Sequence, residues 1–222
     1  MNNNETRRDN FAHLTIALVT FLLLSSLAQQ FLEHKWWGRL LEGALLLTVT
    51  IGVWSVRSEK GMFRGGVGLI AAILLVSLGG YLLDSQGMTV MHEILVLVFF
   101  IVATWVAVKQ VLFSGQIDGN AIVGAICVYL LLGMIWALLF SLVDGVQPGS
   151  FKGLADTGAN SHFMDLIYFS FVSLTTMGFG DITPVLPLAR FLAYMEGIVG
   201  QFYLAILVAS LVGARVSSWK QP

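Results

Sequence analysis

Charged residues divide this chain into long apolar stretches. Six stretches are near the length of about 20 residues that a helix needs to cross a bilayer, at about residues 11–31, 40–55, 65–83, 90–113, 119–143 and 188–212. One carboxylate, Glu196, lies well inside the last stretch. The pattern predicts an all-α membrane protein with six transmembrane helices.

A further apolar stretch, residues 166–180, is too short to cross and ends in glycines. Its first part predicts a helix of about three turns over residues 163–175, with Asn160 and Ser161 as caps and Asp165 in the first turn. Irregular backbone is tolerated at membrane depth only where protein buries it or it lines a water-filled path. We therefore predict a re-entrant helix followed by a loop inside the membrane.

The composition agrees with a membrane protein and excludes several other classes. Hydrophobic residues make up 57% of the chain and charged residues 11%, and the net charge of -1 leaves no large basic surface for nucleic acid. The one cysteine, Cys127, has no partner in the chain for a disulfide or a cysteine metal site. Since the sequence has no nucleotide-binding loop, metalloprotease motif or nucleophile constellation, we expect neither catalysis nor a cofactor.

Lysine and arginine gather on one side of the predicted membrane, in a split of eight to four between alternate loops. The eight are Arg7, Arg8, Arg57, Lys60, Arg64, Lys109, Arg215 and Lys220. Because cytoplasmic loops carry the excess, both termini are predicted to be cytoplasmic in a cell membrane. The first stretch loosely imitates a secretory signal, but its length favours a retained helix.

The loop after the re-entrant helix carries the candidate chemistry. Residues 176–180 read Thr-Met-Gly-Phe-Gly, and glycine reaches backbone angles that are closed to other residues. Such a strand can turn successive carbonyls to one side, where they and the Thr176 hydroxyl can replace the water shell of a monovalent cation. The partial negative charge at the carboxyl end of the helix would favour the cation. Met177 and Phe179 are expected to pack behind the strand.

Residues 175–181, Thr-Thr-Met-Gly-Phe-Gly-Asp, resemble the selectivity-filter signature of the tetrameric pore-loop potassium channels. The order of outer helix, extracellular loop, pore helix, filter and inner helix resembles that family from about residue 118 to residue 215, which assigns residues 115–222 to a pore domain. The resemblance implies that K+ binds backbone carbonyls of the filter, and the Thr176 hydroxyl, at Thr176, Met177, Gly178, Phe179 and Gly180. Thr175 and Asp181 would support this filter, with Asp181 at its outer mouth.

One copy of the segment cannot surround an ion, so four copies are needed and a homotetramer is expected, in agreement with the family. Two residues depart from the family pattern. Phe179 stands where many relatives have tyrosine, and Met177 stands where they have valine or isoleucine. Both changes leave the backbone ligands in place, but they predict a more labile filter than usual.

Residues 1–114 share only the six-span plan with the family. They are expected to form a four-helix membrane domain that resembles a voltage-sensor domain without its gating charges. A voltage-sensing helix carries a row of arginines, whereas the stretch at 90–113 has only Lys109. We therefore predict weak voltage dependence.

The last apolar stretch contains the candidate gate. Gly200, nineteen residues after Asp181, matches the hinge glycine of the family. By the same spacing, the inner cavity or lower gate would be lined by Val208, Ala209 and Val212. The alternative is that Gly200 and Gly197 only let this helix pass close to the pore helix. Glu196 either is hydrogen-bonded behind the filter, where it holds the pore helix in place, or senses protons.

The sequence thus predicts a potassium-selective channel that conducts K+ passively, with the bilayer and other copies of the chain as partners and no nucleic acid. The alternatives are a weakly selective cation channel, a potassium transporter subunit and a non-conducting regulatory membrane protein. A transporter of this kind would carry four degenerate repeats, and this sequence has one. Nine residues follow Gly213, so we expect no tethered nucleotide- or calcium-binding domain to gate the pore.

Overall fold

The fold comes from a computed structural model, which describes residues 3–31, 48, 60–83, 86–112, 119–155 and 159–219. Most of these residues form long helices: α1 (Asn3–Phe31), α3 (Lys60–Leu83), α4 (Gln86–Leu112), α5 (Gly119–Val146) and α7 (Pro187–Trp219). Between α5 and α7 lie the short helix α6 (Ala159–Leu174) and two short strands, β1 (Phe151–Lys152) and β2 (Thr183–Pro184).

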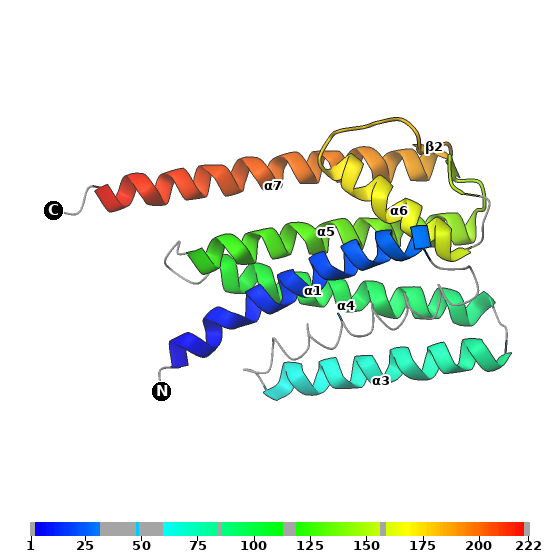
Figure 1. Ribbon diagram of the computed structural model, residues 1–222, viewed down its shortest axis with the longest axis horizontal. Coiled ribbons are helices and arrows are strands. Elements are labelled where there is room, and N and C mark those ends of the chain that lie inside the picture. Colours follow the sequence, from blue (N-terminus) through cyan, green and yellow to red (C-terminus); the bar gives the residue numbers. More distant parts are fainter. Residues whose placement is uncertain are drawn as a thin grey trace.

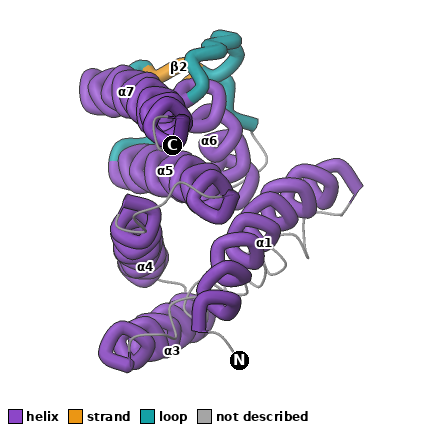
Figure 2. The backbone as a smooth tube through the Cα atoms, turned by 90° about the vertical axis from the view of Figure 1, so that its left-hand side faces the viewer, coloured by secondary structure: helices purple, strands orange, loops and turns teal. Residues whose placement is uncertain are grey.

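The long helices run along one direction of the molecule, and α6 lies obliquely between α5 and α7 (Figure 1). The start of α1 and the end of α7 lie at the same end of the molecule, on the left of Figure 1. Seen from that end, α7, α5, α4 and α3 follow one another and α1 lies to one side (Figure 2). Since α5 contacts α1, α4, α6 and α7, it is the central helix of the described fold.

Among the described residues, three helices are long and apolar enough to cross a membrane: Gly87–Lys109 in α4, Ala121–Val146 in α5 and Pro187–Ser210 in α7. The apolar parts of α1 and α3 are shorter, Phe11–Leu27 and Arg64–Gly80, and so is that of α6, His162–Leu174. The predicted stretch at 40–55 lies outside the described residues, apart from Thr48. The chain is therefore a helical, multi-pass membrane protein, and the number of six spans stays a prediction.

The larger core joins α1, α3, α4 and α5. Its fully buried side chains include Leu18 of α1, Ile73 of α3, Phe100 of α4 and Leu131 of α5, and Met164 and Ile167 extend it to α6. Because lipid tails are as apolar as these side chains, close packing rather than escape from water stabilises such contacts within a membrane. The first helices are thus attached to the rest of the chain through α5.

A second, smaller core surrounds the outer half of α6. Phe169 packs edge-to-face on Phe140 of α5 and Phe151 of β1, with ring centroids 5.1 and 5.4 Å apart. Ile182, which follows the filter, and Ala189 of α7 complete this cluster. T-shaped contacts of this kind add about 0.5–1.5 kcal/mol each beyond the area they bury. The cluster fixes the segments on either side of the filter to the same aromatic group.

The connection from α5 to α6 contains a short strand. Strand β1 pairs with β2 in an antiparallel ladder, with Lys152 opposite Thr183. Helix α6 also begins at Ala159, so the prediction that Asn160 and Ser161 cap it is wrong. Asp165 is not in the first turn, and its carboxylate accepts a hydrogen bond from the amide of Ala155 instead (2.8 Å).

Candidate functional site

The last turn of α6, the predicted pore helix, is closed by the first residues of the predicted filter, residues 175–181. The amide nitrogen of Thr176 lies 2.9 Å from the carbonyl oxygen of Ser173, and that of Met177 lies 2.9 Å from the oxygen of Val172. These two bonds form a Schellman motif, which ends a helix with one residue in the left-handed region. That residue is Thr176, with a φ of 59°. The filter strand therefore starts directly from the cap of the pore helix.

Thr176 is an unusual residue for this position, which glycine most often occupies. A β-branched residue at positive φ is strained, at a cost of order 1–3 kcal/mol. Strain of this size persists only where the surrounding structure imposes it, and it gathers at functional sites. The chain thus keeps a hydroxyl group at a place where the backbone conformation favours glycine.

The left-handed conformation recurs at every second residue of the filter. The φ angles are 59° at Thr176, 56° at Gly178 and 79° at Gly180, whereas Met177 and Phe179 have no positive φ. An alternation of this kind turns alternate peptide groups, as the sequence predicts for a strand with its carbonyls on one side. Among the described residues, no group donates a hydrogen bond to a carbonyl of residues 176–180.

The two large side chains of the filter have little cover. Met177 is 61% exposed and Phe179 is 66% exposed. Within a single chain the described contacts hold this strand at its two ends and leave its middle open, so the packing of Met177 and Phe179 behind the strand stays a prediction. Apolar side chains exposed in this way need other protein or lipid to cover them.

The outer end of the filter is held from two sides. The hydroxyl of Tyr168 on α6 donates to Oδ2 of Asp181 (2.7 Å), and this bond lowers the pKa of the Asp181 carboxyl below its ordinary value. On the other side, Gly153 follows β1 with a φ of 90°, and a Cβ there would collide with the carbonyl oxygen of Asp181. Asp181 is thus fixed by its side chain to the pore helix and by its backbone to the outer loop, of which residues 147–155 are described.

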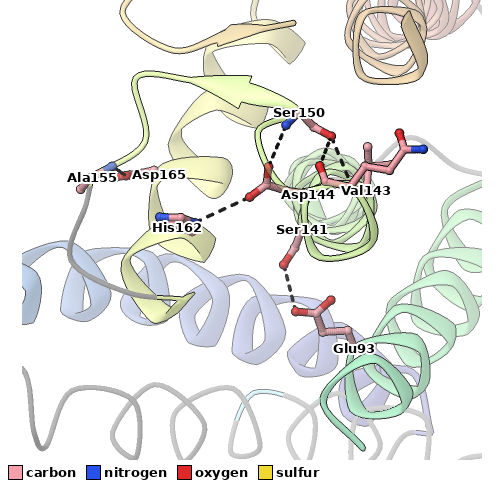
Figure 3. A network of polar contacts seen from close by, with 9 residues as sticks. Glu93, Ser141, Val143, Asp144, Ser150, Ala155, His162 and Asp165 are labelled. Carbon is pink, nitrogen blue, oxygen red and sulfur yellow. Dashed lines mark hydrogen bonds and ion pairs between the residues drawn. The ribbon is translucent and has the colours of Figure 1, made fainter. Parts of the chain in front are cut away.

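Polar contacts also anchor the outer loop on its neighbours (Figure 3). Asp144, near the end of α5, accepts a hydrogen bond from the amide of Ser150 (3.1 Å) and lies 3.6 Å from Nδ1 of His162 on α6. The contact with His162 is an ion pair only when the imidazole is protonated. Ser150 is fully buried, and its hydroxyl donates to the carbonyl of Gln147 (2.6 Å). The loop therefore has a rigid base at the end of α5.

A side-chain bond joins the first helices to this base. The hydroxyl of Ser141 on α5 donates to Oε1 of Glu93 on α4 (3.0 Å), one turn before Asp144 (Figure 3). Glu93 is partly buried at this helix contact. Displacement of α4 would therefore pull on the end of α5, from which the outer loop starts.

The back of the pore helix is closed by a buried polar group. Glu196 of α7 is fully buried, and its Oε1 lies 2.6 Å from the hydroxyl oxygen of Ser170 on α6. The same Ser170 oxygen lies 2.7 Å from the carbonyl oxygen of Gly133 on α5. At Gly133 an added Cβ would lie 2.6 Å from the ring of Phe171, so a side chain there would require that ring to shift. The three helices of the pore region meet at this point.

The inner end of the filter contacts α7. Gly200 is buried against the last turn of α6, where an added Cβ would collide with the carbonyl oxygen of Leu174. Close packing at Gly200 is therefore present, and its role as a hinge stays a prediction. The side-chain nitrogen Nε2 of Gln201 lies 3.3 Å from Oγ1 of Thr176. The hydroxyl of Tyr129 on α5 donates to the carbonyl of Leu174 as well (3.2 Å).

The candidate gate residues lie farther along α7. The side chain of Val208 is 58% exposed and Ala209 is exposed. The backbone of Val212 belongs to α7, but its side chain lies outside the described residues. Val208 and Ala209 are therefore uncovered in a single chain, and their place at a cavity or gate stays a prediction.

Residues 124–215, which contain α6, the filter and most of α5 and α7, match the protein-family model described as "Ion channel". This segment is an ion-channel domain. Similar curated proteins are the inward rectifier potassium channel Kirbac3.1 of Paramagnetospirillum magnetotacticum, 31% identical over 39% of this chain, and two plant proteins. These are two pore potassium channel c of Oryza sativa subsp. japonica (35% over 29%) and two-pore potassium channel 5 of Arabidopsis thaliana (33% over 35%). The matched parts cover 26%, 14% and 19% of those three proteins. No solved structure matches the chain.

Several residues that shape the ion-channel domain were missed by the sequence analysis: Tyr129, Gly133, Gly153, Tyr168, Ser170 and Gln201. One of them could have been found. A buried carboxyl group needs a hydrogen-bond partner, and Ser170 is a polar residue in the middle of the apolar pore helix, at the depth where Glu196 was expected. The other contacts depend on how helices that are distant in sequence cross, for which the apolar pattern gives no signal.

Proposed function

We propose that this chain forms a potassium-selective channel, which conducts K+ passively through the backbone carbonyls of residues 176–180. The observation that carries the proposal is the alternation of left-handed residues at Thr176, Gly178 and Gly180. Carbonyl rings of this kind replace the hydration shell of K+ in potassium-channel filters. The names of the similar proteins, all potassium channels, support K+ as the permeant ion.

The proposal includes a homotetramer. One strand cannot surround an ion, and the exposed Met177 and Phe179 side chains would gain cover from neighbouring copies. In such an assembly the Thr176 hydroxyl would be the innermost ligand. Thr175 would support the filter from below, because its hydroxyl donates to the carbonyl of Phe171 (2.6 Å), and Asp181 would stand at the outer mouth.

The proposed orientation places both termini in the cytoplasm and the outer loop outside a cell membrane. The common position of the start of α1 and the end of α7 supports this topology (Figure 1). Residues 1–114 would form a four-helix domain without gating charges. Lys109, the basic residue in the last turn of α4, has its amine 4.9 Å from the centroid of the Trp105 ring. We therefore expect weak dependence of the current on voltage.

The test is ion flux into liposomes that contain the purified full chain, with K+ and Na+ compared at equal concentration. We expect K+ flux well above Na+ flux, and loss of both in Gly178→Ala, because alanine is strained at the left-handed φ of this position. A matched control is Gly149→Ala in the outer loop. Gly149 has a φ of 85° and, like Gly178, has nothing within 4 Å of an added Cβ.

The outcomes separate the candidate functions. Loss of flux in Gly178→Ala but not in Gly149→Ala supports conduction through the filter. Equal K+ and Na+ fluxes would favour the weakly selective cation channel. A folded tetramer that passes neither ion would contradict the proposal and favour a non-conducting membrane protein.

A further inference from the structure

The buried oxygens of Glu196, Ser170 and Gly133 make two short contacts, each of which needs a hydrogen atom between its two oxygens. If Glu196 is a carboxylate, only one such hydrogen atom is present. Both contacts of the Ser170 oxygen are short, 2.6 Å to Glu196 and 2.7 Å to Gly133. Both residues with side chains, Ser170 and Glu196, are fully buried. A serine hydroxyl has one hydrogen, and a backbone carbonyl can only accept. A carboxylate can likewise only accept, so one of the two short contacts would lack a proton.

A protonated Glu196 removes this conflict. A carboxylic acid has its own O–H group, which can donate to the Ser170 oxygen while the Ser170 hydroxyl donates to Gly133. Burial favours the same assignment, because an unpaired carboxylate in an apolar interior is far more costly than a neutral acid. Among the described residues no lysine, arginine or histidine pairs with Glu196, and its Oε2 has no hydrogen-bond partner.

We propose that Glu196 is a neutral carboxylic acid in the folded protein and the first donor in a series of two hydrogen bonds that links α7, α6 and α5. In this series Glu196 donates to Ser170, and Ser170 donates to the carbonyl of Gly133. Glu196 is then a positioning residue for the filter. The carbonyls of Val172 and Ser173, which follow Ser170 within one turn, hold the amides of Met177 and Thr176, so a displaced α6 displaces the filter.

The protonation state can be measured without conduction. The infrared spectrum of the purified full chain at neutral pH is expected to show the carbonyl band of a protonated carboxylic acid, shifted by deuteration and absent in Glu196→Gln. The band should persist in Glu93→Gln, which removes the carboxyl of α4 that accepts a hydrogen bond from Ser141. In Ser170→Ala the band should move to higher frequency, because the acid loses its acceptor. A spectrum in which Glu196→Gln removes only carboxylate bands would overturn the proposal.

The positioning role has a second readout, which rests on the proposed function. Glutamine keeps an N–H donor at position 196, whereas alanine does not. We expect Glu196→Gln to keep the K+ to Na+ flux ratio within about twofold of the unmodified protein, and Glu196→Ala to lower it by roughly fivefold, the equivalent of one hydrogen bond. Equal losses in both variants would show that the charge is needed and would contradict a donor role. If the unmodified protein shows the acid band but no flux, the proposed function fails and the neutral acid stands.

Discussion

The pore helix and the filter that follows it differ in how much of their surroundings a single chain supplies. In α6 the side chains of Leu166, Ser170 and Leu174 are almost fully buried, and the helix packs against α5 and α7. In the filter, Met177 and Phe179 are about two-thirds exposed. The filter strand takes its shape from its two ends, the cap of α6 and the contacts of Asp181. A single chain therefore builds the support of the filter, whereas the middle of the strand has little cover within that chain. In the proposed homotetramer, other copies would cover it.

The largest effect is expected from a substitution that disrupts the packing of α7 on α6. Gly200→Ala places a methyl group against the backbone carbonyl of Leu174, which cannot rotate away as a side chain would. We expect it to destabilise the pore region by about 1–3 kcal/mol. Thermal unfolding of the purified protein measures this loss.

The matched control is Gly197→Ala, one turn earlier on the same helix. There an added Cβ would lie 3.7 Å from the carbonyl of Ser173, an ordinary contact distance. We expect little change in its unfolding temperature. If both variants unfold at the same temperature, close packing at Gly200 is not what holds α7 on α6.

The next pair of substitutions separates the effect of the left-handed backbone at Thr176 from the effect of its hydroxyl group. Thr176→Gly should relieve the left-handed strain and raise stability by about 1 kcal/mol, while the loss of the hydroxyl should lower the K+ to Na+ flux ratio. Thr176→Ser keeps the hydroxyl and should keep selectivity. Loss of stability in Thr176→Gly would mean that the threonine side chain supports the cap in a way that the φ angle does not show.

A smaller effect is expected at the outer end. The hydrogen bond from Tyr168 holds the pKa of Asp181 below its ordinary value, which is about 3.9. This contribution is present above the ordinary pKa and is lost as the pH falls through the lowered one. Between pH 5 and 8 the bond should therefore be intact, and Tyr168→Phe should raise the pKa of Asp181, because the largest cause of its lowering is removed.

A carboxyl-carbon NMR titration of Asp181 measures this change. The flux of Tyr168→Phe should also become sensitive to acid at a higher pH than that of the unmodified protein. Identical titration curves in the two proteins would show that the Tyr168 hydroxyl does not act on Asp181.

The smallest effect is expected from Phe179→Tyr. In a single chain the ring of Phe179 is largely exposed, so an added hydroxyl finds no described partner in its own chain. The sequence suggests that the filter is labile because this position lacks a phenol. If so, the K+ flux through Phe179→Tyr should decay more slowly over time than that through the unmodified protein. Unchanged decay would assign the stability of the filter to Tyr168 and Asp181 instead.

The apolar pattern predicted the helices of the pore region closely. The predicted stretch at 119–143 corresponds to α5 at Gly119–Val146, and the one at 188–212 lies within α7 at Pro187–Trp219. Both helices continue beyond the predicted stretches, α5 through Asp144 and Gly145 and α7 through Gly213 and Arg215. The alternation at residues 176–180 could also be predicted, since glycine at positions 178 and 180 permits the left-handed backbone that such a strand requires.

The supporting contacts could not be predicted, because they depend on geometry between distant segments. The pairing of β1 with β2 involves two residues on each side, too few for a strand pattern. Thr176 shows a different limit, since a β-branched residue is not expected at positive φ. There the cap of α6 overrides the preference of the residue.

The ladder between Lys152 and Thr183 affects how the filter unfolds locally. It joins the chain before the pore helix to the chain after the filter, so the filter lies inside a closed loop. The amides of Thr176 and Met177, bonded to the end of α6, should therefore exchange their hydrogens with solvent at one common rate, set by the opening of that loop as a unit.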